Sequence, residues 1–408
     1  MHKTNKSMSY VDTHVLLAPS DWESFQTHPQ EKAVRLAKNN KVLYVNRSPR
    51  YIQTWGLKGK QNYVYRLLNR DLRKIHNNLY VVTPPPMLPL QFSIISRYFP
   101  DQIARKMIRL SKELLLLSIK YILKKLDWKV DYLWMWFPYD AHLVGRLSEK
   151  RSIYRTFDEV GEFPSSREIK DIIEELDVQM CRKVDYVICS AKSQYDKRRN
   201  INPATYFIPF GVNFKHFNSA LNDSVAKPCD WSAISGKKGI IGYAGCIDWR
   251  FDFDLMEKLA SSNKELAFVL IGPYRDYGFK TLERLCRNEN VFWLGEKPFG
   301  ILPNYVAYFD VGILPYKVGP DTNSMRVYKV FEYLACGKPV VSTNLYEVKQ
   351  MGGVINIASD FAEFQKLIYA SLEFTGDPDA IRERMAFAQG LDWDNIYQQF
   401  ARTIGFNV

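Results

Sequence analysis

Lys329 and Glu332 stand three residues apart in the segment VYKVFEYLACGKPVVST. Side chains three apart on a helix share one face. Near the start of a helix, an ammonium and a carboxylate can hold a phosphate and a sugar hydroxyl together. The same spacing also suits a surface ion pair, which contributes little to stability. The spacing alone leaves both interpretations open.

The surrounding segment predicts the elements that position this pair. Gly337 and Pro339 are a helix stop signal, and the β-branched residues at 340–343 favour a strand. The unit is therefore helix, turn and strand. Short apolar runs predict further strands at 15–18, 42–45, 79–83, 132–137, 152–157, 186–189, 206–208, 239–245, 267–271, 291–294, 311–314 and 354–357. Helical stretches alternate with them, which indicates parallel α/β sheets.

Length and composition limit the kind of protein. The 408 residues exceed one ordinary core and predict two domains. Six cysteines are scattered without a CxxC pair, which indicates a reducing compartment. The first residues lack the apolar run of a secretion signal, and no apolar stretch is long enough to span a bilayer. We expect a soluble protein in the cytoplasm.

The positive charge is concentrated in the first half. The net charge is +12, and residues 41–129 hold eighteen Lys or Arg against four Asp or Glu. This distribution predicts an anionic partner for that region. The apolar pattern at 103–126 carries seven cations and predicts a helix suited to an anionic bilayer, or one packed on the sheet with its lysines in water. We expect peripheral attachment to the inner face of the cell membrane and no nucleic-acid partner.

The second half then resembles a known family. The blocks IIGYAGCIDWRFDFDL, FVLIGP, NVFWLGEKPFGILPNYVAYFDVGILPY and KVFEYLACGKPVVST occur in the order found in the donor domain of GT-B glycosyltransferases. Within this group, the chain resembles the teichuronic-acid-type glycosyltransferases and the xanthan glucuronosyltransferase. The resemblance implies two doubly wound Rossmann-like domains facing a cleft. These would be an acceptor domain at 1–213 and a donor domain at 214–390, with 391–408 crossing back to the first.

The resemblance also implies a donor site. Glu332 would bind ribose hydroxyls, Lys329 the diphosphate or a sugar carboxylate, and Gly242, Gly245 and Arg250 would lie against the diphosphate. The loop 316–325 would close over the sugar. The remaining donor-binding residues are Tyr316, Ser324, Met325 and Arg326. The expected co-substrate is a nucleoside-diphosphate sugar with UDP as its nucleotide, and the acceptor is a lipid-linked cell-surface glycan intermediate.

The resemblance indicates an inverting mechanism. Retaining members of the large related family carry a second glutamate at the position that Ser324 occupies here. In the xanthan enzyme an aspartate after a YR-containing strand acts as base, and YRTFDEV puts Asp158 in that place. Asp21, on the loop after the first strand, is the second candidate. We expect Asp21, Trp22 and Glu159 to bind the acceptor. A retaining transferase is the alternative.

Cofactor chemistry is not expected. The GT-B fold can stabilise its leaving group with cations and a helix N-terminus, so it requires no metal. Asp252 and Asp254 resemble a metal-binding DxD but open a predicted helix, where carboxylates cap amides. An NAD-dependent oxidoreductase is disfavoured because neither half has a complete GxGxxG. A non-catalytic nucleotide-sugar-binding protein at the membrane surface is the remaining alternative.

Overall fold

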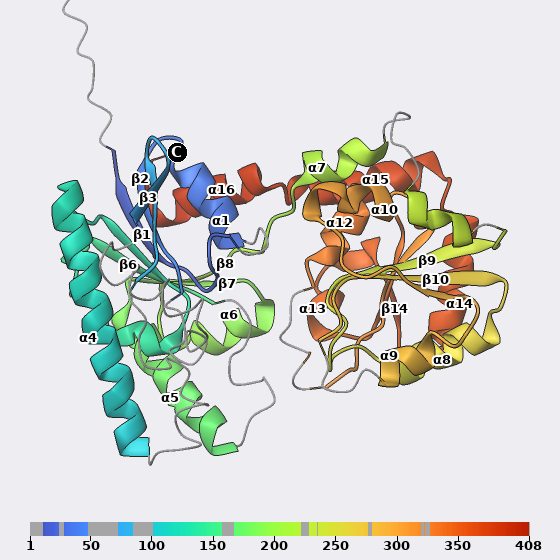
Figure 1. The fold of residues 1–408 in the computed structure, drawn as a ribbon, viewed down its shortest axis with the longest axis horizontal. Coiled ribbons are helices and arrows are strands. Elements are labelled where there is room, and N and C mark those ends of the chain that lie inside the picture. Colours follow the sequence, from blue (N-terminus) through green and yellow to red (C-terminus); the bar gives the residue numbers. More distant parts are fainter. Residues whose placement is uncertain are drawn as a thin grey trace, which may run out of the picture. The chain divides into compact units, whose positions relative to one another are not determined.

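A computed structural model describes residues 11–23, 28–47, 72–84, 101–156, 167–221, 228–234, 236–275, 280–319, 322 and 327–407. The chain divides into two compact units (Figure 1). The first unit contains Met1–Ile208 and Tyr397–Val408, and the second contains Pro209–Ile396. Each unit is built around one largely parallel sheet with helices packed on it.

The first unit has an eight-stranded sheet in the order β3-β4-β2-β1-β5-β6-β7-β8. All neighbouring strands are parallel except the β3–β4 hairpin. The strands are β1 (Thr13–Leu17), β2 (Lys41–Val45), β3 (Leu72–His76), β4 (Leu79–Val82), β5 (Tyr132–Met135), β6 (Arg151–Arg155), β7 (Tyr186–Cys189) and β8 (Thr205–Phe207). The helices are α1 (His28–Leu36), α4 (Asp101–Leu126), the 3-10 helix η2 (Pro138–His142), α5 (Arg167–Lys183) and α6 (Lys192–Arg198).

Both faces of this sheet are covered. Leu115 and Ile119 of α4 and Met180 of α5 join one core cluster with Leu17 and Leu133 of the central strands. On the opposite face, the Trp134 ring lies 5.9 Å from Phe400 of α16 (Trp393–Ile404). Central strands buried on both faces are apolar runs, which is why the sequence predicts them well.

The edge strand β3 was not predicted. Its sequence, LRKIH, is polar and only partly buried, as is common for a sheet edge that must not pair with other chains. Such a strand lacks the apolar signal that identified the others.

The second unit has a six-stranded parallel sheet in the order β11-β10-β9-β12-β13-β14. The strands are β9 (Gly239–Ala244), β10 (Leu266–Ile271), β11 (Val291–Trp293), β12 (Val311–Leu314), β13 (Val340–Thr343) and β14 (Asn356–Ala358). The α-helices are α7 (Phe214–Asn218), α8 (Phe253–Ser262), α9 (Lys280–Leu285), α10 (Leu302–Val306), α12 (Lys329–Ala335), α13 (Tyr346–Lys349), α14 (Phe361–Glu373) and α15 (Pro378–Gly390). The 3-10 helices are η4 (Ser219–Leu221), η5 (Cys229–Ile234), η6 (Phe299–Ile301) and η7 (Gly352–Val354).

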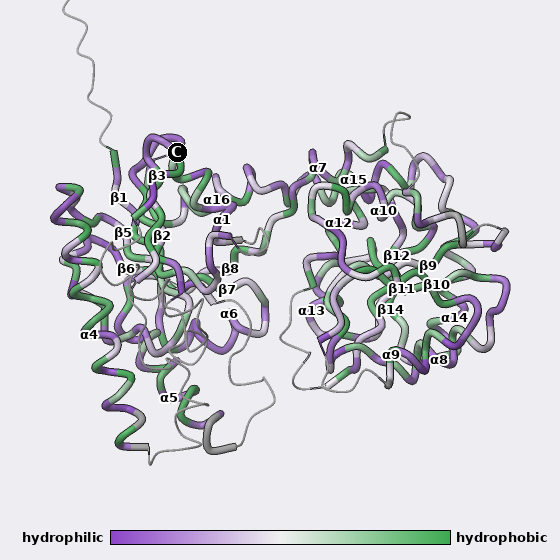
Figure 2. The backbone as a smooth tube through the Cα atoms, in the orientation of Figure 1, coloured by the Kyte–Doolittle hydropathy of each residue, from purple (hydrophilic) through white to green (hydrophobic). Residues whose placement is uncertain are grey.

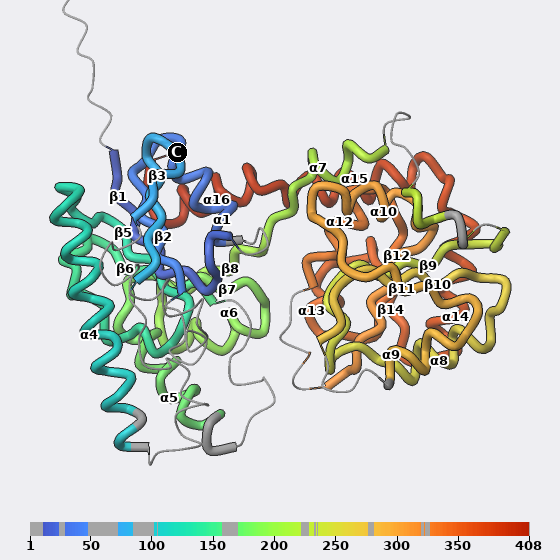
Figure 3. The backbone as a smooth tube through the Cα atoms, viewed as in Figure 1, coloured from blue at the N-terminus to red at the C-terminus, as the bar shows by residue number. Residues whose placement is uncertain are grey.

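The last helix, α16, belongs to both units. It begins at Trp393 in the second unit, and its residues from Tyr397 onward belong to the first. Figure 3 shows the end of the chain beside the first strands and helix of the first unit. There Asn407 hydrogen-bonds to Asp12, and Asn40 donates to the Asn407 carbonyl over 2.9 Å. The chain therefore returns to the unit in which it starts.

Candidate functional site

The second sheet has a switch in connection order at its centre. From β9 the chain continues outward to β10 and β11, then crosses to β12, on the other side of β9, and on to β13 and β14. Ligands of open α/β sheets bind beyond the carboxyl ends of the strands at such a switch. The ends of β9 and β12 are therefore where a ligand site is expected in this unit.

Lys329 lies at this position. Its Nζ donates to the Tyr243 hydroxyl over 3.0 Å and to the Tyr316 hydroxyl over 2.6 Å. The two hydroxyls are 3.0 Å apart, and that of Tyr243 also donates to the Cys246 carbonyl. Burial raises the pKa of Tyr243 well above its ordinary value, so its hydroxyl stays neutral. An ammonium has three N–H donors, and these bonds use two.

Glu332 lies one turn further along α12 and is partly exposed. Burial raises its pKa to about 7, and the Lys329 charge opposes that shift. No ion pair joins Glu332 to Lys329, both of which lie in the described part of the chain, so the surface-pair interpretation is wrong. The next residue, Tyr333, fixes α12 to β9, because its hydroxyl accepts a 2.7 Å hydrogen bond from the Ala244 amide.

Gly242 in β9 and Gly245 just after it differ in what they accommodate. A Cβ on Gly245 would lie 2.0 Å from the Lys329 Nζ, so the missing side chain leaves room for the ammonium. A Cβ on Gly242 would lie about 2.1 Å from the Phe309 ring. Gly242 is buried inside the strand, so we correct the expectation that it lies against a diphosphate. Its missing side chain serves packing.

Arg250 is paired within its own loop. Its Nε donates to the two carboxylate oxygens of Asp248 over 2.8 and 3.1 Å. The Arg250 carbonyl accepts a hydrogen bond from the Lys317 amide, and Phe251 forms an isolated antiparallel β-bridge with Tyr316. The loop after β9 is thus tied to the segment after β12. We expected Arg250 to face a diphosphate, and the sequence did not predict its ion pair with Asp248.

Tyr316 has a different place from the one we expected. Tyr316 is 2% exposed, and its hydroxyl accepts a hydrogen bond from Lys329, so it holds the lysine in place and does not line an open sugar site. Tyr243 was missed altogether. The signal that could have found it is an aromatic residue with a hydroxyl between two glycines at the end of a strand.

Several candidate residues lie outside the described residues. These are Asp158, Glu159, Ser324, Met325 and Arg326. Their flanking elements are described, and β6 ends at Arg155, close in sequence to Asp158. Of the loop 316–325, residues 316–319 and 322 are described, and the Thr322 hydroxyl donates to the Lys317 carbonyl over 2.6 Å.

Asp21 and Trp22 follow β1 at the carboxyl edge of the first sheet. Asp21 is exposed, and its carbonyl accepts from Gln30 of α1. The Trp22 amide donates to Asn46 after β2, and its ring meets Tyr44 edge-on at 5.1 Å. The loop therefore places Asp21 at the carboxyl edge of the sheet, the same edge at which β6 ends.

Asp252 is a helix cap. Its Oδ1 accepts a 3.0 Å hydrogen bond from the Leu255 amide at the start of α8. The capping prediction is confirmed.

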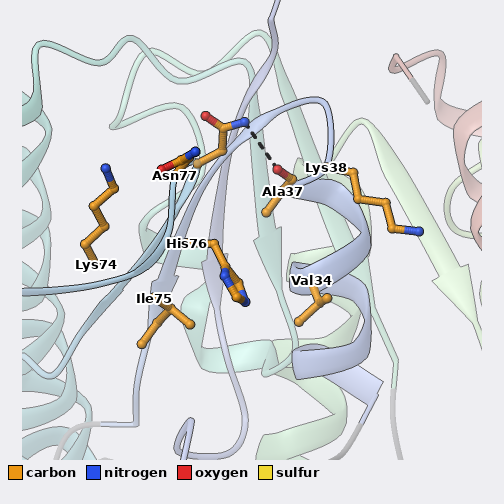
Figure 4. Close-up of a pocket in the computed structure, with 8 residues that line it drawn as sticks. Val34, Ala37, Lys38, Lys74, Ile75, His76 and Asn77 are labelled. Carbon is orange, nitrogen blue, oxygen red and sulfur yellow. Dashed lines mark hydrogen bonds between the residues drawn. The ribbon is translucent and has the colours of Figure 1, made fainter.

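A pocket of about 760 Å³ in the first unit lies at the end of the sheet opposite to the carboxyl ends of the strands (Figure 4). It is lined by the end of α1 and the β3–β4 turn, and Asn78 at that turn donates to the Ala37 carbonyl over 3.3 Å. That turn directly precedes β4, so the pocket lies where the parallel strands begin. It is not part of the expected site.

Part of the second unit matches the model of a known protein family. Residues 248–373, which include Arg250, Tyr316, Lys329 and Glu332, match the family model described as glycosyl transferases group 1. This segment is a glycosyltransferase group 1 domain. It begins just after β9, so Tyr243 and Gly245 lie outside the matched residues.

A curated protein similar to this chain is named "Putative teichuronic acid biosynthesis glycosyltransferase TuaH" from Bacillus subtilis (strain 168). It is 26% identical over 245 residues, which are 58% of this chain. The chain spans 60% of that relative's length.

Solved structures share the fold over nearly the whole chain. Anabaena HepE in complex with UDP is 15% identical with a TM-score of 0.64, and the match covers 97% of this chain and 100% of that one. Sucrose-phosphate synthase from Thermosynechococcus elongatus is 14% identical with a TM-score of 0.67, covering 97% and 98%. The predicted GT-B fold, with two Rossmann-like domains, is confirmed.

Proposed function

We propose that this protein is a GT-B glycosyltransferase that moves a sugar from a UDP-sugar to a lipid-linked cell-surface glycan intermediate. The observation that carries the proposal is the Lys329 ammonium, fixed by two tyrosine hydroxyls at the carboxyl ends of β9 and β12 within a group 1 domain. The printed names of the relatives support the substrates, since HepE was solved with UDP and the curated relative is named for teichuronic acid biosynthesis.

In this proposal Lys329 binds the donor diphosphate. The third N–H of its ammonium donates to a phosphate oxygen and stabilises the charge that develops on the leaving group. The Glu332 carboxylate accepts hydrogen bonds from the ribose hydroxyls. Gly245 lets the ligand and the ammonium approach the backbone, and Ser324, Met325 and Arg326 complete the donor site. A metal is not required, because cations of the chain neutralise the diphosphate.

The transfer proceeds with inversion in this proposal. Asp158 takes the proton of the acceptor hydroxyl while that oxygen attacks the anomeric carbon and the nucleoside diphosphate departs from the opposite face. Asp21, Trp22 and Glu159 orient the acceptor. The enzyme works at the cytoplasmic face of the membrane, where the basic region 41–129 meets anionic lipid.

A ligand screen tests the donor class. UDP-glucose and UDP-glucuronic acid are compared with GDP-mannose and NAD by thermal shift, since a ligand that binds only the folded protein raises its Tm. We expect stabilisation by UDP-sugars alone. No shift with any UDP-sugar in the presence of membrane lipid extract would overturn the proposed donor class, and a shift with NAD would favour an oxidoreductase. Stabilisation by a UDP-sugar without transfer to any acceptor would favour the non-catalytic alternative.

Asp158→Asn tests the base. The amide keeps the size of the side chain but takes up no proton, so we expect transfer to fall about 10²- to 10⁴-fold with UDP-sugar binding unchanged. Asp21→Asn is the matched control and should lower the rate less. NMR of the product gives its anomeric configuration. A retained configuration would remove Asp158 from the role of base.

A further inference from the structure

Helix α4 buries one face and exposes another that is apolar. Leu115, Ile119 and Ile122 pack in the core of the first unit, and the buried Lys112 forms an ion pair with Asp140 that fixes the rotation of the helix. The residues Ile103, Leu110, Leu114, Leu117 and Tyr121 are between 45% and 62% exposed. Their spacings of seven, four, three and four residues place them in one stripe. Figure 2 shows apolar and polar residues alternating along α4.

Cations border this stripe. At about 100° per residue, Lys106, Lys120 and Lys124 follow one side and Lys125 the other. All four are exposed, and within the described ranges none is paired with a carboxylate. The carboxylate of Glu113 on the same helix is engaged by Arg146 and His142, which lower its pKa to about 2. The surface along the stripe is therefore both apolar and positive.

A pocket lies at the carboxyl-terminal end of the same helix. Its volume is about 360 Å³, and Lys120, Lys124 and Lys129 line it together with Trp128 and Ser148. Three ammonium groups, an indole and a hydroxyl suit a phosphate group that carries an apolar or glycerol substituent. The pocket shares Lys120 and Lys124 with the border of the stripe, so one ligand surface can engage both.

We propose that this face of α4 docks on an anionic lipid bilayer, with the leucines at the level of the acyl chains and a lipid phosphate in the lysine pocket. A second copy of the chain is a poorer occupant, because two such helices would bring rows of unpaired cations together. Among the described helices, none is long and apolar enough to cross the membrane. An interfacial helix, parallel to the bilayer, needs only one apolar face flanked by cations.

This inference rests on the membrane location in the proposed function and specifies the surface that produces it. It does not depend on the sugar-transfer chemistry. Vesicle binding without any nucleotide sugar tests the surface, whereas the thermal-shift screen tests the donor site. Failure of one is therefore distinguishable from failure of the other.

The experiment measures co-sedimentation of the full chain with phosphatidylcholine vesicles, with and without phosphatidylglycerol. We expect binding to the anionic vesicles alone, weakening as salt rises. Lys120→Gln/Lys124→Gln/Lys129→Gln should lower the partition coefficient on the order of 100-fold, at about fivefold for each lysine. Leu110→Ser/Leu117→Ser should lower it on the order of tenfold by removing buried apolar area.

Matched controls carry the same changes on exposed positions of the second unit. Lys258→Gln/Lys349→Gln/Lys366→Gln repeats the charge change, and Ile301→Ser/Phe374→Ser repeats the polar substitution. Both should bind like wild type. The proposal would be overturned if the controls lost vesicle binding equally, or if the α4 variants bound vesicles like wild type. It would also be overturned if the wild type formed a dimer that the leucine variant abolishes.

Hydrogen exchange of the wild-type protein gives a readout that needs no variant. Residues 103–125 should gain protection on anionic vesicles and show no change with inorganic phosphate. Protection confined to another part of the chain would contradict the assignment to α4.

Discussion

Two lysines next to aromatic rings have opposite environments in the two units. Lys32 of α1 is 6% exposed, with its Nζ 4.1 Å from the centre of the Trp134 ring and 3.9 Å from that of Phe400. Its Nζ has no hydrogen-bond acceptor among the described residues. Lys329 also lies over an aromatic ring, with its Nζ 4.5 Å from the centre of the Tyr243 ring, but two tyrosine hydroxyls accept hydrogen bonds from its ammonium.

The difference shows that an aromatic neighbour alone does not decide whether a lysine is a packed residue or a binding group. Ring faces attract a cation but do not replace the hydrogen bonds that it makes in water. Burial, and to a smaller extent the charge of Arg155, therefore lower the pKa of Lys32 well below its ordinary value. Hydroxyls replace two of those hydrogen bonds for Lys329. We infer that Lys32 is a packed part of the first unit and Lys329 a binding group of the second.

Replacing each lysine by methionine is the strongest test of this comparison. Lys329→Met removes the charge-assisted hydrogen bond that the proposed function assigns between Lys329 and the diphosphate, so we expect UDP-sugar affinity to fall about 100-fold. Lys32→Met should leave that affinity unchanged. Isothermal titration calorimetry measures both. Equal affinities for wild type and Lys329→Met would remove the lysine from the donor site.

Gly242 in β9 and Gly245 just after it give a second test within the second unit. The methyl group of Gly242→Ala would clash with the Phe309 ring, so the free energy of unfolding should fall by about 2–3 kcal/mol. The methyl group of Gly245→Ala would meet mainly the end of the flexible Lys329 side chain, with the Tyr243 hydroxyl 3.3 Å away. It should therefore displace the ammonium and weaken UDP-sugar binding about tenfold with little change in stability. Urea unfolding and calorimetry separate the two effects. The reverse pattern would contradict the assignment.

The stability of Lys32→Met tests the structural role of the buried lysine. The folded state lowers the pKa of Lys32, so the stability that its neutral form contributes is lost as the pH falls below about 10.5. Methionine carries no charge, and we expect Lys32→Met to raise the free energy of unfolding by about 1–3 kcal/mol at pH 7, with the gain shrinking towards pH 10. Denaturant titrations at both pH values measure it. A destabilised variant at pH 7 would show that the ammonium has a stabilising partner.

The smallest effect concerns the pH dependence of Glu332. Its pKa in the folded protein is raised to about 7, so the protonated form stabilises the free protein, and this contribution is lost as the pH rises from about 4.5 through 7. In the proposed function, ribose binding needs the Glu332 carboxylate. UDP-glucose affinity should therefore rise about tenfold from pH 6 to pH 8. Glu332→Gln should flatten the profile, and an unchanged slope in that variant would assign the titration to another group.

Much of the fold could be predicted because its signals are local. The runs at 186–189, 311–314 and 340–343 were predicted with the bounds that the structure gives them. The Asp252 cap was predicted from carboxylates at the start of a helical pattern. Edge strand β3 was not predicted, because a polar edge carries no apolar run.

The candidate site could be predicted only in part. Lys329 and Glu332 were found because three-residue spacing on a helix is visible in the sequence. The partners of Lys329 at 243 and 316 lie far away along the chain, and no local pattern pairs them. The Asp248–Arg250 pair is close in sequence, but two nearby charges form an ion pair only in a suitable loop geometry.

The sequence by itself therefore determined the alternation of strands and helices, the charge of the first half and the face that carries Lys329 and Glu332. Tertiary structure decided that Gly245 accommodates the Lys329 ammonium and Gly242 the ring of Phe309. It also decided that Lys32 is buried while Leu110, Leu114 and Leu117 of α4 stay exposed. The physical reason is that residue type and spacing act along the chain, whereas burial, hydrogen-bond partners and free surface depend on which distant elements pack together.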